Sequence, residues 1–281
     1  MSSVAPRNPL FINTILLGGG ILDKVGAARA AGFDQIELWR QDVEAHGNHH
    51  DSLSSILRQH GLGLTDYQVL LDFDGAPASL RESKRTEAIL MLETAVTVGA
   101  TTLLVPACTN RECVADRIED DLRWLAREAA SRQLRIAYEC MAWSTVNFTL
   151  AAAWQCVKRL DEPNVGIVVD AFHIFARSRD ARDLDGIPMD RIYLVQLSDL
   201  GDGIVHEHLI TTARHRRLLP GRGRFPIETI LNPLKEAGYA GPVGLEVFND
   251  ELKAHDPYIV AREAMASLRE VWLGSKRLSW A

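Results

Sequence analysis

Eight short apolar runs alternate with helix-like segments along the chain, and this alternation is the strongest constraint on its fold. The run at residues 165–170 (VGIVVD) is typical, because it is too short for a helix and does not alternate in polarity. Such a run indicates a strand buried on both faces of a parallel sheet, in which helical crossovers join neighbouring strands. The predicted strands span residues 10–17, 35–39, 63–70, 102–106, 135–140, 165–170, 192–199 and 242–249.

Eight β/α units in 281 residues favour a closed (β/α)8 TIM barrel of the α/β class over an open doubly wound sheet. Sequences of the GxGxxG or GxxxxGK[ST] type, which would support a nucleotide-binding sheet, are absent. No linker-like segment interrupts the chain, so we expect a single barrel domain over residues 1–281. Active sites of such barrels lie at the C-terminal ends of the strands.

Each of the last four predicted strands carries an oxygen-bearing side chain close to its C-terminal end. A single buried acid is more often paired with an arginine, because an unpaired buried charge is strongly disfavoured. Four such side chains around one half of the rim are better explained by one divalent cation. Three carboxylates and one amide oxygen suit Mg²⁺ or Mn²⁺, with Co²⁺ as a further candidate. The predicted metal ligands are Glu139, Asp170, Gln196 and Glu246.

Other polar residues near the predicted strand ends are candidates for catalysis and substrate binding. His173 follows Asp170 by three residues, and an imidazole beside a metal can take a proton from carbon. Residues 200–223, which we expect to form a long loop, carry a basic cluster that includes His215 and Arg217, and we expect one or two of its members to bind an anionic substrate. Further candidates for the pocket are Glu37, Tyr67 and Arg111.

The charge balance and the termini limit the expected partners. A net charge of −6 argues against nucleic acid as the main partner. No run has the length of a membrane span, and the N-terminus lacks the pattern of a signal peptide, so we expect a cytoplasmic protein without a membrane partner. The four cysteines show no metal-ligand spacing and receive no function, and a homo-oligomer is left open.

With these residues the chain resembles the xylose isomerase-like barrel superfamily, the sugar phosphate isomerase/epimerase group, over nearly its whole length. Within that group it most closely resembles the 3-dehydroshikimate dehydratases. The features that carry the resemblance are the four predicted metal ligands, with Gln196 where many relatives have histidine, the DxxH pair of Asp170 and His173, and ARHRRLLPGRG at residues 213–223. The DYQVLLDFDG segment at residues 66–75 is also similar.

The resemblance implies a metal-dependent dehydration of 3-dehydroshikimate to protocatechuate, a step of quinate and shikimate catabolism. It further implies that His173 is the general base and that Arg217 binds the carboxylate of this small-molecule substrate. Two positions depart from the family pattern: Arg224 stands where an acid often follows PGxG, and Met141 stands where some relatives have a histidine.

Three other functions stay open on the sequence. A sugar or inositol isomerase or epimerase would use the same metal and an acid pair such as Glu139 and Glu246, and PGRG at residues 220–223 would then be read as a phosphate site. An endonuclease IV-like repair enzyme is opposed by the net charge of −6. An inactive barrel that serves as a binding protein is opposed by the intact acids at all four ligand positions.

Overall fold

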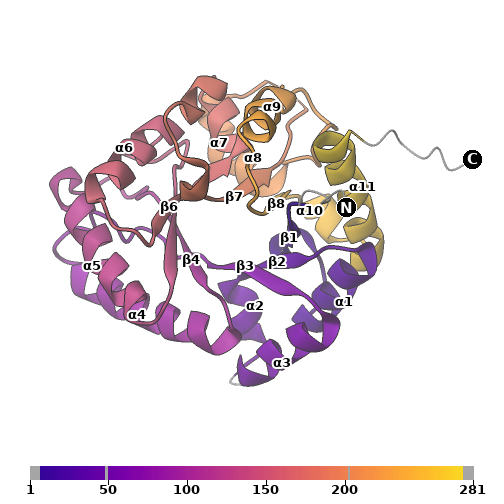
Figure 1. Ribbon diagram of the computed structural model, residues 1–281, viewed down its shortest axis with the longest axis horizontal. Coiled ribbons are helices and arrows are strands. Elements are labelled where there is room, and N and C mark those ends of the chain that lie inside the picture. Colours follow the sequence, from indigo (N-terminus) through magenta and orange to yellow (C-terminus); the bar gives the residue numbers. More distant parts are fainter. Residues whose placement is uncertain (1–6, 48–49, 202, 275–281) are drawn as a thin grey trace, which may run out of the picture.

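A closed barrel of eight parallel strands forms the centre of the molecule, with the strands in chain order around it (Figure 1). The computed structural model describes residues 7–47, 50–201 and 203–274. The TIM barrel expected from the sequence is confirmed. The strands are β1 (Leu10–Asn13), β2 (Gln35–Trp39), β3 (Gly63–Gln68), β4 (Thr102–Pro106), β5 (Arg135–Glu139), β6 (Val165–Asp170), β7 (Ile192–Leu197) and β8 (Val243–Leu245).

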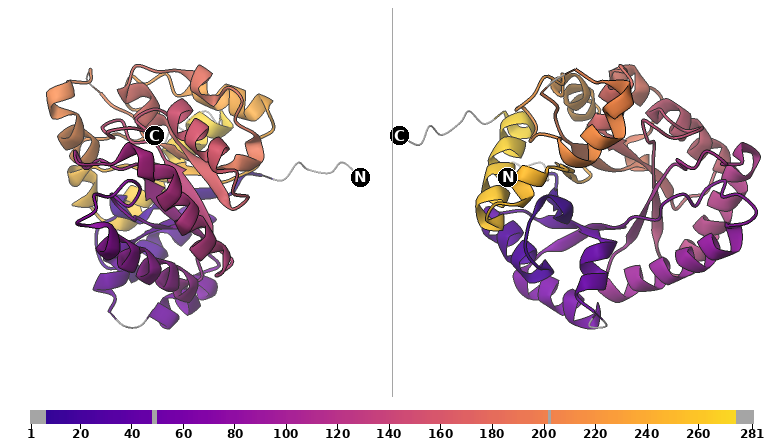
Figure 2. Two further views of the ribbon diagram at one scale, coloured as in Figure 1. Left: turned by 90° about the vertical axis from the view of Figure 1, so that its left-hand side faces the viewer. Right: turned by 180° about the vertical axis from the view of Figure 1, so that it is seen from behind.

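Helices surround the barrel as an outer ring, which Figure 2 shows from the side and from behind. The longest are α4 and α11, and α11 packs beside α1 so that the last helix closes the ring against the first. The helices are α1 (Ile21–Ala31), α2 (Arg40–Ala45), α3 (His50–His60), α4 (Arg81–Val98), α5 (Ile118–Ala130), α6 (Leu150–Leu160), α7 (Ala171–Ala176), α8 (Leu209–His215), α9 (Glu228–Glu236), α10 (Asp250–Lys253) and α11 (Pro257–Leu273).

Five strands end earlier than the sequence predicts, and the first and the last do so by four residues, each next to a polar residue. The first strand stops at Asn13, because the Asn13 side chain accepts a hydrogen bond from Ile15 N and caps a 3₁₀ turn at Thr14–Leu16. The last strand stops at Leu245, so Glu246 lies just beyond it. Helices α2, α8 and α10 were not predicted, and α8 lies inside the segment expected to be a loop.

The barrel interior is layered, with an apolar layer beneath a polar one. Phe11, Ala137, Val168 and Leu194 belong to one buried apolar cluster. Successive side chains of a strand alternate between faces, so residues two positions further along point into the same interior. Those residues are Asn13, Glu139, Asp170 and Gln196, and they form a polar layer toward the C-terminal ends of the strands.

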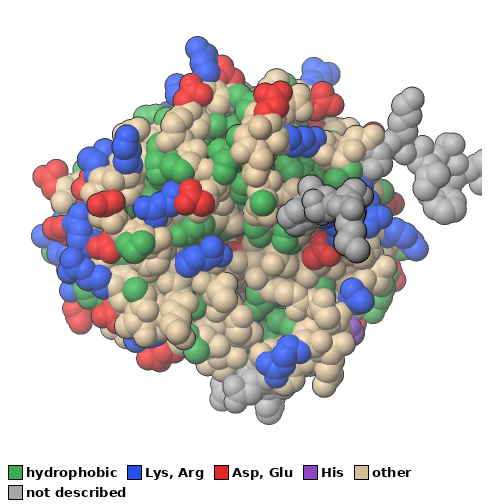
Figure 3. All heavy atoms as spheres, viewed as in Figure 1, with side chains coloured by type: hydrophobic (Ala, Val, Ile, Leu, Met, Phe, Trp, Pro, Cys, Tyr) green, Lys and Arg blue, Asp and Glu red, His purple; other side chains and the backbone are tan. Residues whose placement is uncertain are grey.

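The outer surface shows no dominant charge on the side drawn in Figure 3, where basic and acidic side chains are interspersed. Within the described residues, none of the helices combines the length and the apolar composition needed to cross a bilayer.

Candidate active site

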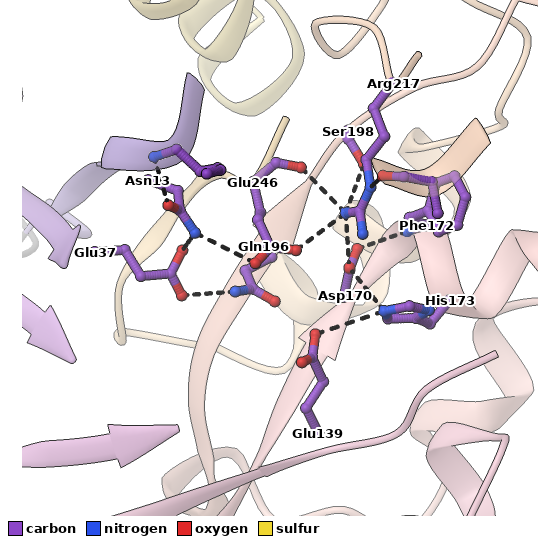
Figure 4. Close-up of polar contacts among 12 residues, drawn as sticks. Asn13, Glu37, Glu139, Asp170, Phe172, His173, Gln196, Ser198, Arg217 and Glu246 are labelled. Atoms are coloured by element: carbon purple, nitrogen blue, oxygen red, sulfur yellow. Dashed lines mark hydrogen bonds and ion pairs between the residues drawn. The ribbon is translucent and has the colours of Figure 1, made fainter. Parts of the chain in front are cut away.

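A ring of buried polar side chains fills the barrel interior at the C-terminal ends of the strands (Figure 4). Parallel pairing brings them level, since Asn13 pairs with Glu37, Glu37 with Asp66, and Asp170 with Gln196. None of these residues is more than 4% exposed. The ring consists of Asn13, Glu37, Asp66, Glu139, Asp170, Gln196 and Glu246.

Arg217 reaches this ring from the chain beyond α8 and is itself only 2% exposed. Its Nη1 lies 3.1 Å from Asp170 Oδ2 and 3.1 Å from Glu246 Oε2. Its Nε donates to the carbonyl oxygen of Ala213 at 2.9 Å, and its guanidinium lies over the rings of Phe172 and Phe248. Two carboxylates and two aromatic faces therefore hold the arginine in one orientation.

The ring contains five carboxyl groups but only this one guanidinium among the described residues. Burial is the largest cause that raises the pKa of Glu37, Asp66 and Glu139 well above the usual range. Burial likewise raises the pKa of Asp170, and it raises that of Glu246 to about 7 although Arg217 opposes the shift. The ring is therefore short of positive charge.

Within the described residues, several buried oxygens of the ring are free to contact a cation, among them both carboxylate oxygens of Asp66. Glu139 Oε1 and Gln196 Oε1 are buried and have no hydrogen-bond partner among the described residues. Ligand atoms of Glu139, Asp170 and His173 lie within 4.8 Å of one another, so this group is close enough to hold a metal ion. Carboxylate and amide oxygens together with a shortage of positive charge fit a hard divalent cation.

His173, at 1% exposure, is held by a hydrogen bond to the backbone. The N–H of Ala142 donates to His173 Nδ1 at 3.1 Å, so the neutral ring carries its proton on Nε2. Nε2 lies 3.5 Å from Asp170 Oδ2 and 3.8 Å from Glu139 Oε1. Burial, and then the nearby Arg217, lower the pKa of His173 well below its usual value, which favours the neutral ring.

A cavity of about 370 Å³ opens directly onto these residues. Glu139, His173, Arg217 and Glu246 line it, as do Met141 and His215. The aromatic side chains of Trp39, Trp143 and Phe248 form much of the remaining wall. The cavity thus combines aromatic and aliphatic walls with a few polar and charged groups, the usual form of a small-molecule site.

Three predicted pocket residues do not line this cavity. Tyr67 packs in the outer core, because the neighbouring Asp66 points inward and alternate residues of a strand face opposite ways. Arg111 is exposed in the turn after β4. Glu37 lies in the ring itself, where it is fully buried. The predicted contact His215 does line the cavity, and its Nδ1 lies 2.9 Å from Asp250 Oδ2.

Sequence reasoning did not identify several site residues. Asn13 and Asp66 belong to the ring, and Gln68, Trp39 and Trp143 line the cavity. Asp66 was detectable in principle, because it is an acid within a predicted strand, which is the signal that revealed the three predicted carboxylate ligands. The aromatic wall gave no such signal, since tryptophans near strand ends are ordinary core residues.

Backbone amides of the PGRG turn donate hydrogen bonds to a side chain of the same protein. The carboxylate of Asp199 accepts hydrogen bonds from the backbone N–H groups of Leu200, Gly221, Gly223 and Phe225 at 2.8–3.0 Å. A Cβ atom at Gly223 would lie 2.4 Å from Asp199 Oδ1, so the close approach requires glycine. These amides are therefore committed to a side chain of the same protein, as Asp199 is 1% exposed.

Known proteins resemble this chain in sequence and in fold. It is 31% identical over 259 residues to a 3-dehydroshikimate dehydratase of Pseudomonas aeruginosa, a match that covers 92% of this chain and 40% of that protein. It is 26% identical to an inosose isomerase of Halalkalibacterium halodurans, over 78% of this chain and 80% of the isomerase. The chain thus spans about two-fifths of the length of the curated dehydratase.

The solved structures agree with this assignment of the fold. A xylose isomerase-like TIM barrel/4-hydroxyphenylpyruvate dioxygenase fusion protein superposes with a TM-score of 0.89 at 28% identity, covering 95% of this chain and 43% of that one. The sequence profile of the xylose isomerase-like TIM barrels matches residues 25–271. The chain therefore belongs to the xylose isomerase-like TIM barrel family.

Proposed function

We propose that this protein dehydrates 3-dehydroshikimate to protocatechuate with the help of one divalent metal ion. The observation that carries the proposal is the ring of five buried carboxyl groups and one guanidinium that adjoins the cavity. The similarity to curated 3-dehydroshikimate dehydratases over 92% of the chain supports the choice of substrate.

The metal would be held by Glu139, Asp170, Gln196 and Glu246, which supply three carboxylates and an amide oxygen. When bound, such a cation acts as a Lewis acid that polarises a ketone and stabilises the negative charge that forms on its oxygen. Two of these four residues have an oxygen without a hydrogen-bond partner in the described part of the chain, which supports the assignment.

Arg217 is suited to bind the substrate carboxylate. Its Nη1 is engaged by Asp170 and Glu246, whereas its Nη2 makes no hydrogen bond to the described residues. The residue lines the cavity, so Nη2 is available to an anion there. The aromatic rings on both faces of the guanidinium keep it in place while it does so.

His173 is the proposed general base. Its depressed pKa keeps it neutral near pH 7, as a base must be, and Nε2 faces the carboxyl group of Asp170. Removal of the proton next to the ketone lets the hydroxyl group on the neighbouring carbon leave, and this group takes up the proton as water. A second ring C–H proton is then lost while the former ketone oxygen takes up a proton, which gives the aromatic catechol. Action at Nε2 requires the ring proton on Nδ1, which means giving up the hydrogen bond from Ala142.

A second candidate is the isomerisation of an inosose or a related ketose, which the similarity to inosose isomerases favours. A phosphorylated sugar fits less well. The backbone amides of the PGRG turn, the donors expected for a phosphate at this end of a barrel, are occupied by Asp199.

The test is a spectrophotometric assay of metal-loaded protein with 3-dehydroshikimate. We expect a catechol product that absorbs in the near ultraviolet, no product after EDTA treatment, and recovery when Mn²⁺ or Mg²⁺ is returned. Glu139→Ala should lose both metal and activity, whereas Arg111→Ala, an exposed residue outside the cavity, should keep both. Metal-loaded protein that leaves 3-dehydroshikimate unchanged but interconverts inososes would establish the second candidate instead.

A further inference from the structure

We propose that Glu37 is a positioning residue that makes Gln196 present its amide oxygen, rather than its amide nitrogen, to the divalent cation. The inference rests on the metal site of the proposed function and assigns a task to a residue that does not line the cavity. It concerns how the ligand is oriented, not how the substrate is bound.

A glutamine ligand differs from a carboxylate because the two ends of its side-chain amide are chemically different. The two ends of its amide have nearly the same shape, but only the oxygen can coordinate a hard cation, because the NH₂ group has no lone pair to offer. A half-turn about the last side-chain bond exchanges the two ends. Some partner must therefore distinguish the two ends in the site that holds the cation.

Glu37 is that partner. Gln196 Nε2 donates to Glu37 Oε1 at 2.6 Å, and both residues are fully buried. The other end of the amide, Oε1, has no hydrogen-bond partner among the described residues. In Figure 4 the nitrogen points to Glu37 and the oxygen points away from it, toward the side of Glu139. The free end is thus the end that a cation needs.

A backbone hydrogen bond fixes which end of the Asn13 side-chain amide donates to Glu37. The N–H of Ile15 donates to Asn13 Oδ1 at 3.0 Å, and a backbone N–H can act only as a donor. Asn13 must therefore turn its Nδ2 the other way, where it donates to Glu37 Oε2 at 2.8 Å and to Glu246 Oε1 at 3.3 Å. Both oxygens of Glu37 accept from amide groups, and this arrangement leaves Gln196 only one favourable orientation.

Replacement of Glu37 by glutamine should remove the preference for one orientation of the Gln196 amide. The new amide side chain of Glu37→Gln would have one acceptor for two donors, and its own NH₂ group would face either Asn13 or Gln196. Facing Gln196, it would attract the amide oxygen and turn the nitrogen toward the cation. We expect Mn²⁺ to bind this variant about 10- to 100-fold more weakly, the usual effect of losing a partner of a metal ligand.

Asp66→Asn is the matched control. Asp66 pairs with Glu37 across the strands, is equally buried, and makes no hydrogen bond to Gln196 in the described structure. Its replacement removes the same charge from the ring. Titration calorimetry of metal-free protein with Mn²⁺ should therefore show a clearly smaller loss of affinity for Asp66→Asn than for Glu37→Gln. Equal losses would mean that charge alone matters, and the inference would be overturned.

A double-mutant cycle tests whether the effect passes through Gln196. In a Gln196→Ala background, Glu37→Gln should cause little further loss of Mn²⁺ affinity, because no amide remains to be oriented. An undiminished loss there would overturn the inference. Circular dichroism of each metal-free variant checks folding. If Glu37→Gln does not fold, Glu37→Ala replaces it, since it removes the acceptor of Gln196 Nε2 and should weaken Mn²⁺ binding in the same Gln196-dependent way.

The measurement contains no substrate, so it separates this inference from the proposed function. Protein that binds Mn²⁺ with the expected dependence on Glu37 but does not dehydrate 3-dehydroshikimate would keep the inference and refute the function. Wild-type protein that binds no Mn²⁺ would overturn the inference.

Discussion

The hydrogen bond from Ala142 N–H to His173 Nδ1 separates two roles for the imidazole. As a base, His173 must accept a proton on Nε2, whereas as a neutral donor it would offer the Nε2 proton to a substrate oxygen. His173→Ala removes both abilities. His173→Gln removes basicity and keeps an N–H donor of similar reach.

For the proposed base role, we expect both His173 variants to retain metal and to lose turnover by roughly 10²- to 10⁴-fold. The check is steady-state kinetics on protein of known metal content. Recovery of most of the activity in His173→Gln, but not in His173→Ala, would assign His173 as a hydrogen-bond donor and leave the base to be found elsewhere.

At the scale of elements, the turn after α8 depends on one buried carboxylate. Asp199 holds four backbone N–H groups of residues 200–225 and thereby fixes the connection between α8, which precedes Arg217, and α9. Asp199→Ala would leave these donors without their partner, and we expect it to lower the free energy of unfolding by about 2–5 kcal/mol.

Urea denaturation at pH 7 measures the effect of Asp199→Ala. The control is Asp190→Ala, which changes an exposed acid at the other end of the barrel wall.

Because Asp199 occupies the backbone amides of the PGRG turn, inorganic phosphate should not stabilise the wild-type protein. A clear stabilisation by millimolar phosphate would show that the turn accepts an external anion, and it would favour the phosphorylated-sugar alternative.

The sequence was sufficient to predict the elements that carry a strong periodic signal. The strand at Val165–Asp170 matches its predicted bounds, and the four predicted metal ligands all lie in one interior layer. Tyr67 was placed on the wrong side of its strand, because the sequence does not show which of two alternating faces is inward. Asn13 was missed because its importance arises from its pairing with Glu37, and no single strand reveals that register.

At the scale of the whole molecule, the buried carboxyl groups couple folding to pH. A carboxyl group with a raised pKa in the folded state stabilises the protein fully below its unfolded value of about 4, and this contribution is lost as pH rises through the folded value. Burial raises the pKa of Glu246 and of Asp74, which lies outside the ring, to about 7 each. The other acids of the ring shift in the same direction.

We therefore expect metal-free protein to lose stability steadily between about pH 4 and pH 7, by up to about 1.4 kcal/mol per pH unit for each such group. Mn²⁺ should compensate for the ring, because a cation replaces its protons, and at 100 times the dissociation constant it adds about 2.7 kcal/mol. Asp74 accepts a hydrogen bond from the hydroxyl group of Tyr138 and is not one of the predicted metal ligands. The Asp74→Asn variant should therefore lose a part of the pH dependence of stability that Mn²⁺ leaves unchanged. Thermal unfolding of the wild-type protein and of the Asp74→Asn variant at pH 5, 6, 7 and 8, with and without Mn²⁺, measures these contributions to the pH dependence of stability. Stability of the metal-free protein that rises over this range would contradict the expected direction, and equal pH dependence with and without Mn²⁺ would place the metal away from the carboxyl ring.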